Sequence, residues 1–497
     1  MFFVNTRKSN DVVNFAQAVL HPMNGMRGGL YVPSYIPKLD IEKLIHLSKL
    51  TYKEILFEVI KIFCNNEISD ADIKNLINQA FVNFSKKNQA NENTNFEFKE
   101  EMFDITTLDK QKYIVNATYG PSGNIEDFGY HLCAEFIDYL SAKIGKTSAV
   151  IDLSLHKSSY VSTAVAVSGK KNLKAFVLMD EKCDNTSMEI LSANYQDNVV
   201  FATIDEVESG KTDLQTLFYL NESFQEQMSV SFIDGVNILH ILAYIPFFIK
   251  LFHQTKMQQF VLVVPSYNAS FAVSAYIASL LGCQIAKIVL CCEKNYFLQN
   301  FQSLKTISFN SDNIDGNITD FTCAYPINFE RILYYFCRSD QTSVFNKLEE
   351  CLMERTAKIS DTVVIDFCDI FQVETCDNEF LLKKEMHNFL KRSGRFCDQN
   401  LALSLICADN AVKTYSNLFA KCNIYIFECM DYRRNIEFIE NAVGFKIQNV
   451  EKMYVVDNKR PIDTIKIGEY NEHFIFQLII DSLNKISSKN NDDEQTS

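Results

Sequence analysis

The sequence predicts an α/β fold with largely parallel sheets. From about residue 110 onward, short runs rich in β-branched residues alternate with stretches that carry apolar residues at helical spacing. Such alternation is typical of parallel strands joined by crossover helices. The 497 residues suggest roughly two to four packed units, and the 47% content of hydrophobic residues is typical of a globular chain.

The predicted strands are short apolar runs with β-branched residues. They are residues 113–115, 149–155, 175–179, 199–204, 230–233, 260–264, 287–290, 363–367 and 424–427. The predicted helices between them begin near Glu126 or cover residues 237–252, 271–281 and 328–336. In a sheet of this kind, ligands bind in the loops after the carboxyl ends of the strands.

The chain divides into four segments. Residues 1–100 are expected to be mostly helical, because residues 41–50 and 52–63 carry apolar residues three and four apart. Residues 101–350 and 351–486 are expected to form two α/β parts around a cleft. A loop at residues 85–95 marks the first boundary, and the polar, acidic residues 487–497 are predicted to be disordered.

The charge and the cysteines exclude several functions. The net charge of −14 disfavours both nucleic acid and anionic membrane surfaces as partners. The longest apolar run, residues 238–252, is too short to span a bilayer. We expect a cytoplasmic chain with reduced thiols, because the amino terminus has no signal pattern. The adjacent Cys291 and Cys292 are expected to be core residues, and no metal site is predicted.

Three motifs in order along the chain resemble threonine synthase. Residues 28–33 read GGLYVP, residues 119–128 read YGPSGNIEDF, and residues 325–334 read YPINFERILY. The resemblance spans about residues 1–450 and implies a tryptophan-synthase-β-like scaffold, the fold-type II scaffold of enzymes that use pyridoxal phosphate, here with an N-terminal helical region. It also implies the conversion of O-phospho-L-homoserine and water to L-threonine and phosphate.

The lysine of that family is missing. The family reads HGP[ST]xAFKDF in the second motif, where this chain has Glu126 followed by Asp127. A carboxylate cannot form an imine with the cofactor aldehyde, and its charge repels the cofactor phosphate. No catalytic residue of the family is therefore expected to be intact at this position.

The family's glycine turns are also missing. Its SGDTG and SGNFG turns align with residues 157–161 and 266–270, which contain no glycine. Such turns bind phosphate through backbone N–H groups, and glycine permits the close approach. The family threonine that faces the pyridine nitrogen aligns with Cys429, and a family histidine near residue 409 is also replaced.

The resemblance implies a former cofactor and substrate cleft. Its residues are Tyr119, Ser122, Asn124, Glu126, Asp127, Lys157, Ser158, Ser159, Ser266, Asn268, Ser270 and Cys429, with Asn328 and Arg331 on the substrate side. Structural alternatives stand beside these roles. Glu126 and Asp127 suit the first turn of a helix, and Asn328 suits a helix start.

The sequence therefore predicts a catalytically inactive homologue of threonine synthase. We expect it to bind a protein partner or a small acidic metabolite and to need no cofactor. One alternative is a divergent, active threonine synthase that uses pyridoxal phosphate and a lysine elsewhere, such as Lys157. Another is a new activity with Glu126 as the general base.

Overall fold

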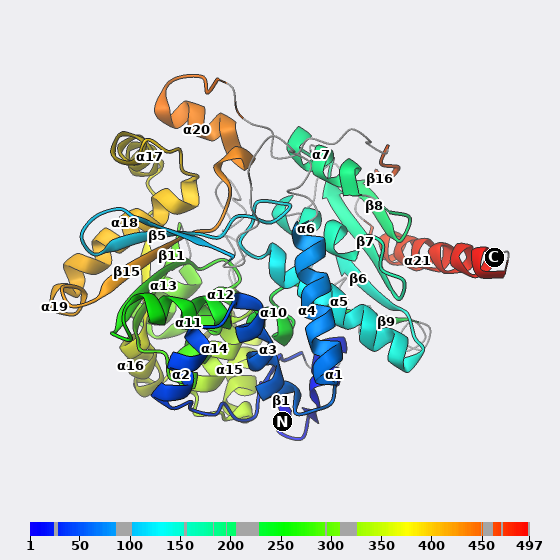
Figure 1. Cartoon of the computed structure of the whole chain (residues 1–497), viewed down its shortest axis with the longest axis horizontal. Coiled ribbons are helices and arrows are strands. Elements are labelled where there is room, and N and C mark those ends of the chain that lie inside the picture. The colour runs from blue at the N-terminus through cyan, green and yellow to red at the C-terminus, as the bar shows by residue number, and fades with distance from the viewer. Residues whose placement is uncertain are drawn as a thin grey trace.

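The structure is a computed structural model. It describes residues 1–23, 28–85, 102–153, 157–181, 183–194, 196–204, 228–293, 296–308, 326–448, 450, 461–468 and 471–495. The predicted boundary loop lies almost entirely outside these residues. Two sheets, built mostly of parallel strands, lie on opposite sides of the molecule (Figure 1). The N-terminal helices lie between and below them.

The larger sheet has the strand order β14-β11-β10-β15-β5-β4 among the described residues. Its strands are β4 (Asp104–Thr107), β5 (Lys112–Asn116), β10 (Phe260–Pro265), β11 (Ile285–Cys292), β14 (Phe371–Thr375) and β15 (Asn423–Glu428). Each pairing is parallel except that of β4 with β5, which is antiparallel. Cys291 and Cys292 are buried within β11, as predicted.

The smaller sheet is parallel throughout, in the order β16-β8-β7-β6-β9. Its strands are β6 (Ser148–Asp152), β7 (Leu173–Asp180), β8 (Val199–Ile204), β9 (Ser229–Ser231) and β16 (Thr464–Ile467). One face packs against the C-terminal helix α21 (Glu472–Gln495), through a cluster that includes Phe176, Ile475 and Ile479. This helix continues through most of the stretch predicted to be disordered.

The N-terminal region is helical, as predicted, but it also contains an antiparallel sheet in the order β2-β1-β3. Its elements are β1 (Phe3–Asn5), β2 (Val12–Val13), α1 (Phe15–Leu20), β3 (Tyr31–Pro33), α2 (Ile41–Ser48), α3 (Tyr52–Cys64) and α4 (Asp70–Ser85). Capping boxes at Asn14 and Thr51 begin α1 and α3. The core of this region is continuous with that of the large sheet.

The remaining elements cover the two sheets. They are α5 (Asp127–Ile144), α6 (Lys157–Val167), α7 (Asn185–Asn194), α10 (Ile238–Ala243), α11 (Ile245–Gln254), α12 (Ser270–Leu281), α13 (Tyr296–Leu304), β12 (Thr306–Ser308), α14 (Phe329–Phe336), α15 (Gln341–Glu354), β13 (Thr356–Lys358), α16 (Asp361–Ile370), α17 (Glu379–Ser393), α18 (Gln399–Thr414), α19 (Ser416–Phe419), the 3-10 turn η2 (Tyr432–Asn435) and α20 (Ile436–Val443). The short strands β12 and β13 pair antiparallel.

Two predicted elements differ. Residues 363–367 form part of helix α16 instead of a strand, because Val364 and Phe367, three residues apart, are the buried positions. The predicted helix 237–252 is two helices, α10 and α11, which meet at Tyr244. Pro246 lies in the first turn of α11, where its missing N–H group costs no helical hydrogen bond.

Candidate functional site

The chain segments that follow five strand ends supply the polar residues of the candidate site. The segment after β5 carries Glu126, the segment after β10 carries Ser270, and Cys429 directly follows β15. The segment after β9 carries Asp234, and Asp152 is the last residue of β6. The site therefore lies where an α/β fold places its ligands.

Glu126 is buried at the start of α5. Its side-chain atom Oε1 accepts a short hydrogen bond from the Ser270 hydroxyl. The His240 atom Nε2 lies 3.9 Å from the same oxygen. The backbone is fixed as well, because the Tyr244 hydroxyl donates to the Glu126 carbonyl over 2.6 Å. The carboxylate at the former lysine position thus points into the protein and ties the β5 loop to the start of α12.

Asp127 faces its own loop instead of Glu126. Its Oδ2 accepts from the Ser122 N–H group over 2.8 Å, and its Oδ1 accepts from the Ser122 and Ser162 hydroxyls. Gly120 packs so tightly against this side chain that an added Cβ would lie 2.1 Å from Oδ2. Burial raises the pKa of Asp127 even though these hydrogen bonds oppose the shift. Asp127 therefore holds the loop together and does not form an acid/base pair with Glu126.

The turn at residues 266–270 keeps a conformation that favours glycine although it has none. Tyr267 has φ 30° and Ala269 has φ 61°, both in the left-handed region. Non-glycine residues in this region carry about 1–2 kcal/mol of strain each. The turn is closed by the Ala269 N–H group, which donates to the Ser266 carbonyl over 2.6 Å, and Ser270 N–H donates to Asn268 Oδ1 over 2.8 Å.

Two residues of this site were not predicted, His240 and Asp234. His240 is fully buried on α10, and its Nδ1 lies 3.0 Å from the Ile233 carbonyl oxygen. The His240 ring packs directly against Gly129. A Cβ added at Gly129 would lie 2.5 Å from His240 Nδ1, so the ring fits only because residue 129 has no side chain. Burial raises the pKa of Asp234 to about 6, and the neighbouring Asp152 and Glu126 add to the rise. The sequence signal for His240 was a histidine inside an otherwise apolar run.

The former cofactor loop at the start of α6 joins the site through Ser159. The Ser159 hydroxyl donates to Asp152 Oδ2 over 3.1 Å and lies 3.2 Å from the Tyr130 hydroxyl. The Tyr130 ring in turn contacts the His240 ring, with 5.3 Å between the ring centroids. Lys157 and Ser158 begin α6, but their side chains lie outside the described part of the structure.

Arg331 is buried, and its guanidinium donates hydrogen bonds to other groups of the protein. Its guanidinium donates to the carbonyl oxygens of Tyr31, Gly235 and Val236 at 3.1, 2.9 and 2.6 Å, and to Asn328 Oδ1. These hydrogen bonds brace the segments around β3 and β9, and the substrate-side role of Arg331 stays a prediction. Asn328 begins α14 without capping it, and within the described ranges its amide nitrogen has no hydrogen-bond partner.

Cys429 and Asn124 belong to one pairing between two loops. The Ile125 N–H group donates to the Cys429 carbonyl over 2.9 Å, and Asp431 N–H donates to the Gly123 carbonyl over 2.8 Å. Burial and the nearby carboxylates, Glu126 among them, raise the pKa of the Cys429 thiol. Tyr119 is directed elsewhere, because its hydroxyl donates a short hydrogen bond to Asp104 on β4.

Three buried polar atoms around Glu126 have no hydrogen-bond partner among the described residues. They are Glu126 Oε2, His240 Nε2 and Asn328 Nδ2. We call Glu126, His240, Ser270 and Asn328 the Glu126 cluster. An unpaired buried polar atom costs about 1–3 kcal/mol, so three such atoms in one region call for an explanation.

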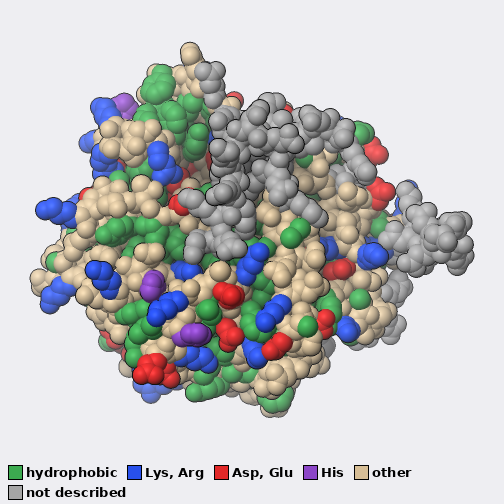
Figure 2. All heavy atoms as spheres, in the orientation of Figure 1, with side chains coloured by type: hydrophobic (Ala, Val, Ile, Leu, Met, Phe, Trp, Pro, Cys, Tyr) green, Lys and Arg blue, Asp and Glu red, His purple; other side chains and the backbone are tan. Residues whose placement is uncertain are grey.

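A surface groove of about 740 Å³ lies elsewhere, at the opposite ends of β5 and β15. Tyr113, Asn423 and Tyr425 line it together with Lys250 and His253 from the end of α11. Histidine, lysine and acidic side chains gather on the surface over α2 and α11 (Figure 2). This groove is separate from the strand-end site.

The comparison with solved structures defines the class of protein as a fold-type II pyridoxal-phosphate scaffold. The X-ray structure of a threonine synthase with bound pyridoxal phosphate from Brucella melitensis superposes with a TM-score of 0.84, at 16% identity over 97% of this chain and 99% of that chain. The crystal structure of the yeast threonine synthase gives a TM-score of 0.82 at 18% identity, over 97% and 99% of the two chains.

The resemblance to the threonine synthase family is confirmed. The family model described as the threonine synthase N terminus matches residues 2–81. The threonine synthase of Eremothecium gossypii is 22% identical over 353 residues, 67% of this chain and 66% of that protein. "Threonine synthase-like 2" of Xenopus laevis is 21% identical over 425 residues, 84% of each chain. The chain thus matches about two thirds of the length of the Eremothecium protein.

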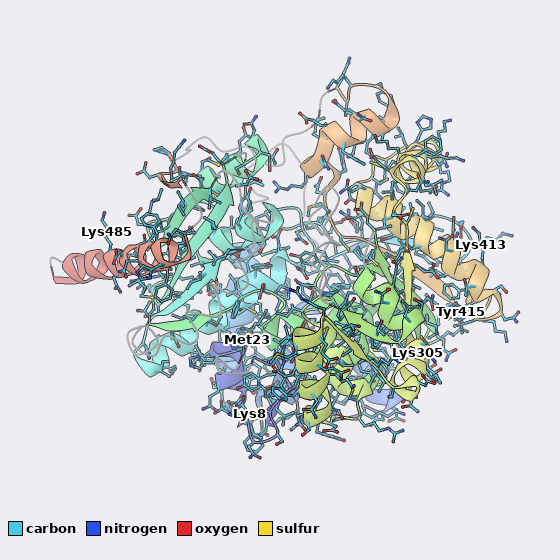
Figure 3. The ribbon with its side chains drawn as sticks, turned by 180° about the vertical axis from the view of Figure 1, so that it is seen from behind. Lys8, Met23, Lys305, Lys413, Tyr415 and Lys485 are labelled. Carbon is cyan, nitrogen blue, oxygen red and sulfur yellow. The ribbon has the colours of Figure 1, made fainter. Side chains whose placement is uncertain are left out.

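The described residues do not fit covalently bound pyridoxal phosphate. The group at the lysine position is a carboxylate that accepts from Ser270, and the turn at residues 266–270 carries the bulky Tyr267 where the family has glycine. Lys413 and Lys485 lie on opposite flanks of the molecule, on α18 and α21 (Figure 3).

None of the helices in the described ranges is both long and apolar enough to cross a membrane.

Proposed function

We propose that this protein is a catalytically inactive homologue of threonine synthase that acts by binding. The observation that carries the proposal is the environment of Glu126. The former lysine position holds a buried carboxylate, and its described contacts are the Ser270 hydroxyl and His240. Neither contact supplies an amine, so the imine on which the family chemistry depends has no donor among the described side chains.

The two glycine turns support the same proposal. Tyr160 occupies one of them and is fully buried, with its hydroxyl 2.9 Å from the Cys183 sulfur. In the other turn, Tyr267 stands at a family glycine position and has positive φ. A side chain at such a position occupies space through which a phosphate reaches backbone N–H groups. The chain thus keeps the scaffold and replaces the groups that hold the cofactor.

The binding role that we propose is performed in the cytoplasm. The free cysteines of the described residues fit a reducing compartment. The partner is a protein chain or a small metabolite. An acidic metabolite would meet Glu126, Asp152 and Asp234 at the strand ends, and like charges at this distance repel. The carboxylates therefore favour a protein chain or a ligand that is not acidic.

Lys157 favours the alternative of an active enzyme. It begins α6, in the loop where the family holds its cofactor. In that alternative the chain is a divergent threonine synthase that converts O-phospho-L-homoserine and water to L-threonine and phosphate. The alternative is testable because the lysine that forms the imine becomes chemically labelled.

The experiment is an absorbance spectrum of the purified protein with added pyridoxal phosphate, before and after borohydride. We expect no aldimine band, no borohydride-fixed adduct and no release of phosphate from O-phospho-L-homoserine. The same spectrum on the variant Lys157→Arg shows whether any adduct depends on that lysine. An adduct on one lysine together with phosphate release would overturn the proposal and establish the active alternative.

A further inference from the structure

We propose that the Glu126 cluster binds a small ligand with a primary ammonium group, which donates to Glu126 Oε2. The inference rests on the proposed function, because a site that held the family cofactor would have no room for this ligand. It reverses the charge preference that the family implies. The site of an anionic cofactor becomes a site for a cation.

The first support is the unpaired oxygen of Glu126. Oε1 accepts from Ser270, whereas Oε2 has no partner among the described residues, and the side chain is 4% exposed. A buried carboxylate is stable when a cation or hydrogen-bond donors satisfy both oxygens. An ammonium group supplies the charge and up to three donors at once.

The second support is the unpaired amide nitrogen of Asn328. It lies close to Ser270, because a Cβ added at Gly235 would lie 2.9 Å from Ser270 Cβ and 3.0 Å from Asn328 Nδ2. Asn328 Nδ2 can only donate, so it needs an acceptor on the ligand. This atom therefore selects a ligand that carries a hydroxyl or carbonyl oxygen besides its ammonium group.

The third support is the charge around the cluster. Asp152 and Glu126 both lie close enough to Asp234 to raise its pKa beyond the effect of burial. The one fully buried arginine nearby, Arg331, is committed to backbone carbonyls and Asn328. His240 Nδ1 faces the Ile233 carbonyl, so a neutral ring leaves Nε2 as a further acceptor. The carboxylates thus outnumber the cations among the described groups.

The test uses ethanolamine as the probe, on the full chain without pyridoxal phosphate. Ethanolamine has an ammonium group and a hydroxyl, and ethylene glycol is its neutral counterpart. We expect ethanolamine at about ten times its Kd to raise the melting temperature by about 1–3 °C. Ethylene glycol and sodium chloride of equal ionic strength should give no rise. Isothermal titration calorimetry on the wild-type chain measures the same binding without any variant.

Glu126→Gln is the diagnostic variant, because it keeps the shape and the Ser270 contact and removes the charge. It should lose the ethanolamine response. Glu135→Gln is the matched control: this buried glutamate pairs with Lys170, away from the cluster, so the response should persist. An absent response in the wild type, an equal response in Glu126→Gln, or an equal effect of ethylene glycol would overturn the inference.

The inference and the proposed function fail differently. An aldimine on one lysine sinks the proposed function whatever ethanolamine does. No aldimine and no ethanolamine binding leaves the chain inactive and shows that its ligand belongs to another class.

Discussion

Two buried polar regions lie side by side in this protein, one around Arg331 and one around Glu126. The Arg331 guanidinium donates hydrogen bonds to three backbone carbonyl oxygens and to one side-chain amide oxygen. Its neighbour Glu330 is satisfied in the same way, by Arg7 at 2.6 Å and by the Thr6 hydroxyl. The Glu126 region leaves three atoms without hydrogen-bond partners among the described residues.

This difference distinguishes buried polar groups that hold the fold together from buried polar groups that bind a ligand. Buried charges that hold a fold together have their hydrogen bonds completed by the protein itself. A ligand-binding site leaves polar atoms unpaired while no ligand is bound, and these unpaired atoms lower the stability of the folded protein. The Arg331 region is therefore expected to be indispensable for folding and the Glu126 region to be dispensable for it.

The largest effect is expected from Arg331→Met. It leaves the carbonyls of Tyr31, Gly235 and Val236 without a donor, so the free energy of unfolding should fall by about 3–5 kcal/mol. Glu126→Gln should remain within about 1 kcal/mol of wild type, because the change keeps the Ser270 contact and removes a buried charge. Chemical denaturation measures both, with the half-exposed Arg392→Met as the control. Equal losses in the two regions would break the comparison.

The next effect is a pH dependence that Asp234 confers. Its pKa is raised to about 6 by burial, above the ordinary value of 3.8. The folded state therefore binds this proton more tightly than the unfolded state. The stability from this group is fully present below about pH 4 and is lost as the pH rises through about 6. The loss is on the order of 2–3 kcal/mol.

The variant Asp234→Asn should lack this dependence. Its stability relative to wild type is expected to increase between pH 5 and pH 8 in urea titrations. Taking the difference cancels the contributions of Asp398 and Glu428, whose pKa values burial raises to about 6 and about 7. A difference that stays constant over this range would show that Asp234 is solvated and lies outside the buried region.

The smallest effect is expected from Ala269→Gly. Ala269 has φ 61°, so glycine relieves strain and should stabilise the protein by a few tenths of a kcal/mol up to about 1 kcal/mol. Ala272→Gly in the following helix is the control, and it should destabilise by about 1 kcal/mol or more. A loss of stability in both variants would mean that the turn is not strained.

The strands of the two sheets were predictable because a fully buried parallel strand is a short, continuous apolar run. Eight of the predicted strands overlap strands of the structure. The strand prediction for residues 363–367 was wrong because β-branched residues also occur in helices. Only the three-residue spacing of the buried Val364 and Phe367 distinguishes a helix from a strand here. The N-terminal strands are two or three residues long, too short for a periodic pattern to appear.

The site was predictable only where a motif fixes the alignment. Glu126, Ser270 and Cys429 do come together. His240 and Asp234 lack such a motif, and their approach to Glu126 depends on how α10 packs against α5. Arg331 was assigned to the substrate side from its motif, and the motif gave no signal of the backbone carbonyls to which its guanidinium donates.

The turn at residues 266–270 has a backbone that suits glycine better than the residues it carries. Tyr267, which aligns with the first glycine of the family's SGNFG turn, has φ 30°, a value that glycine adopts with less strain. A designer who wished to rebuild an anion-binding turn would start from a backbone of the right shape and would have to change side chains alone.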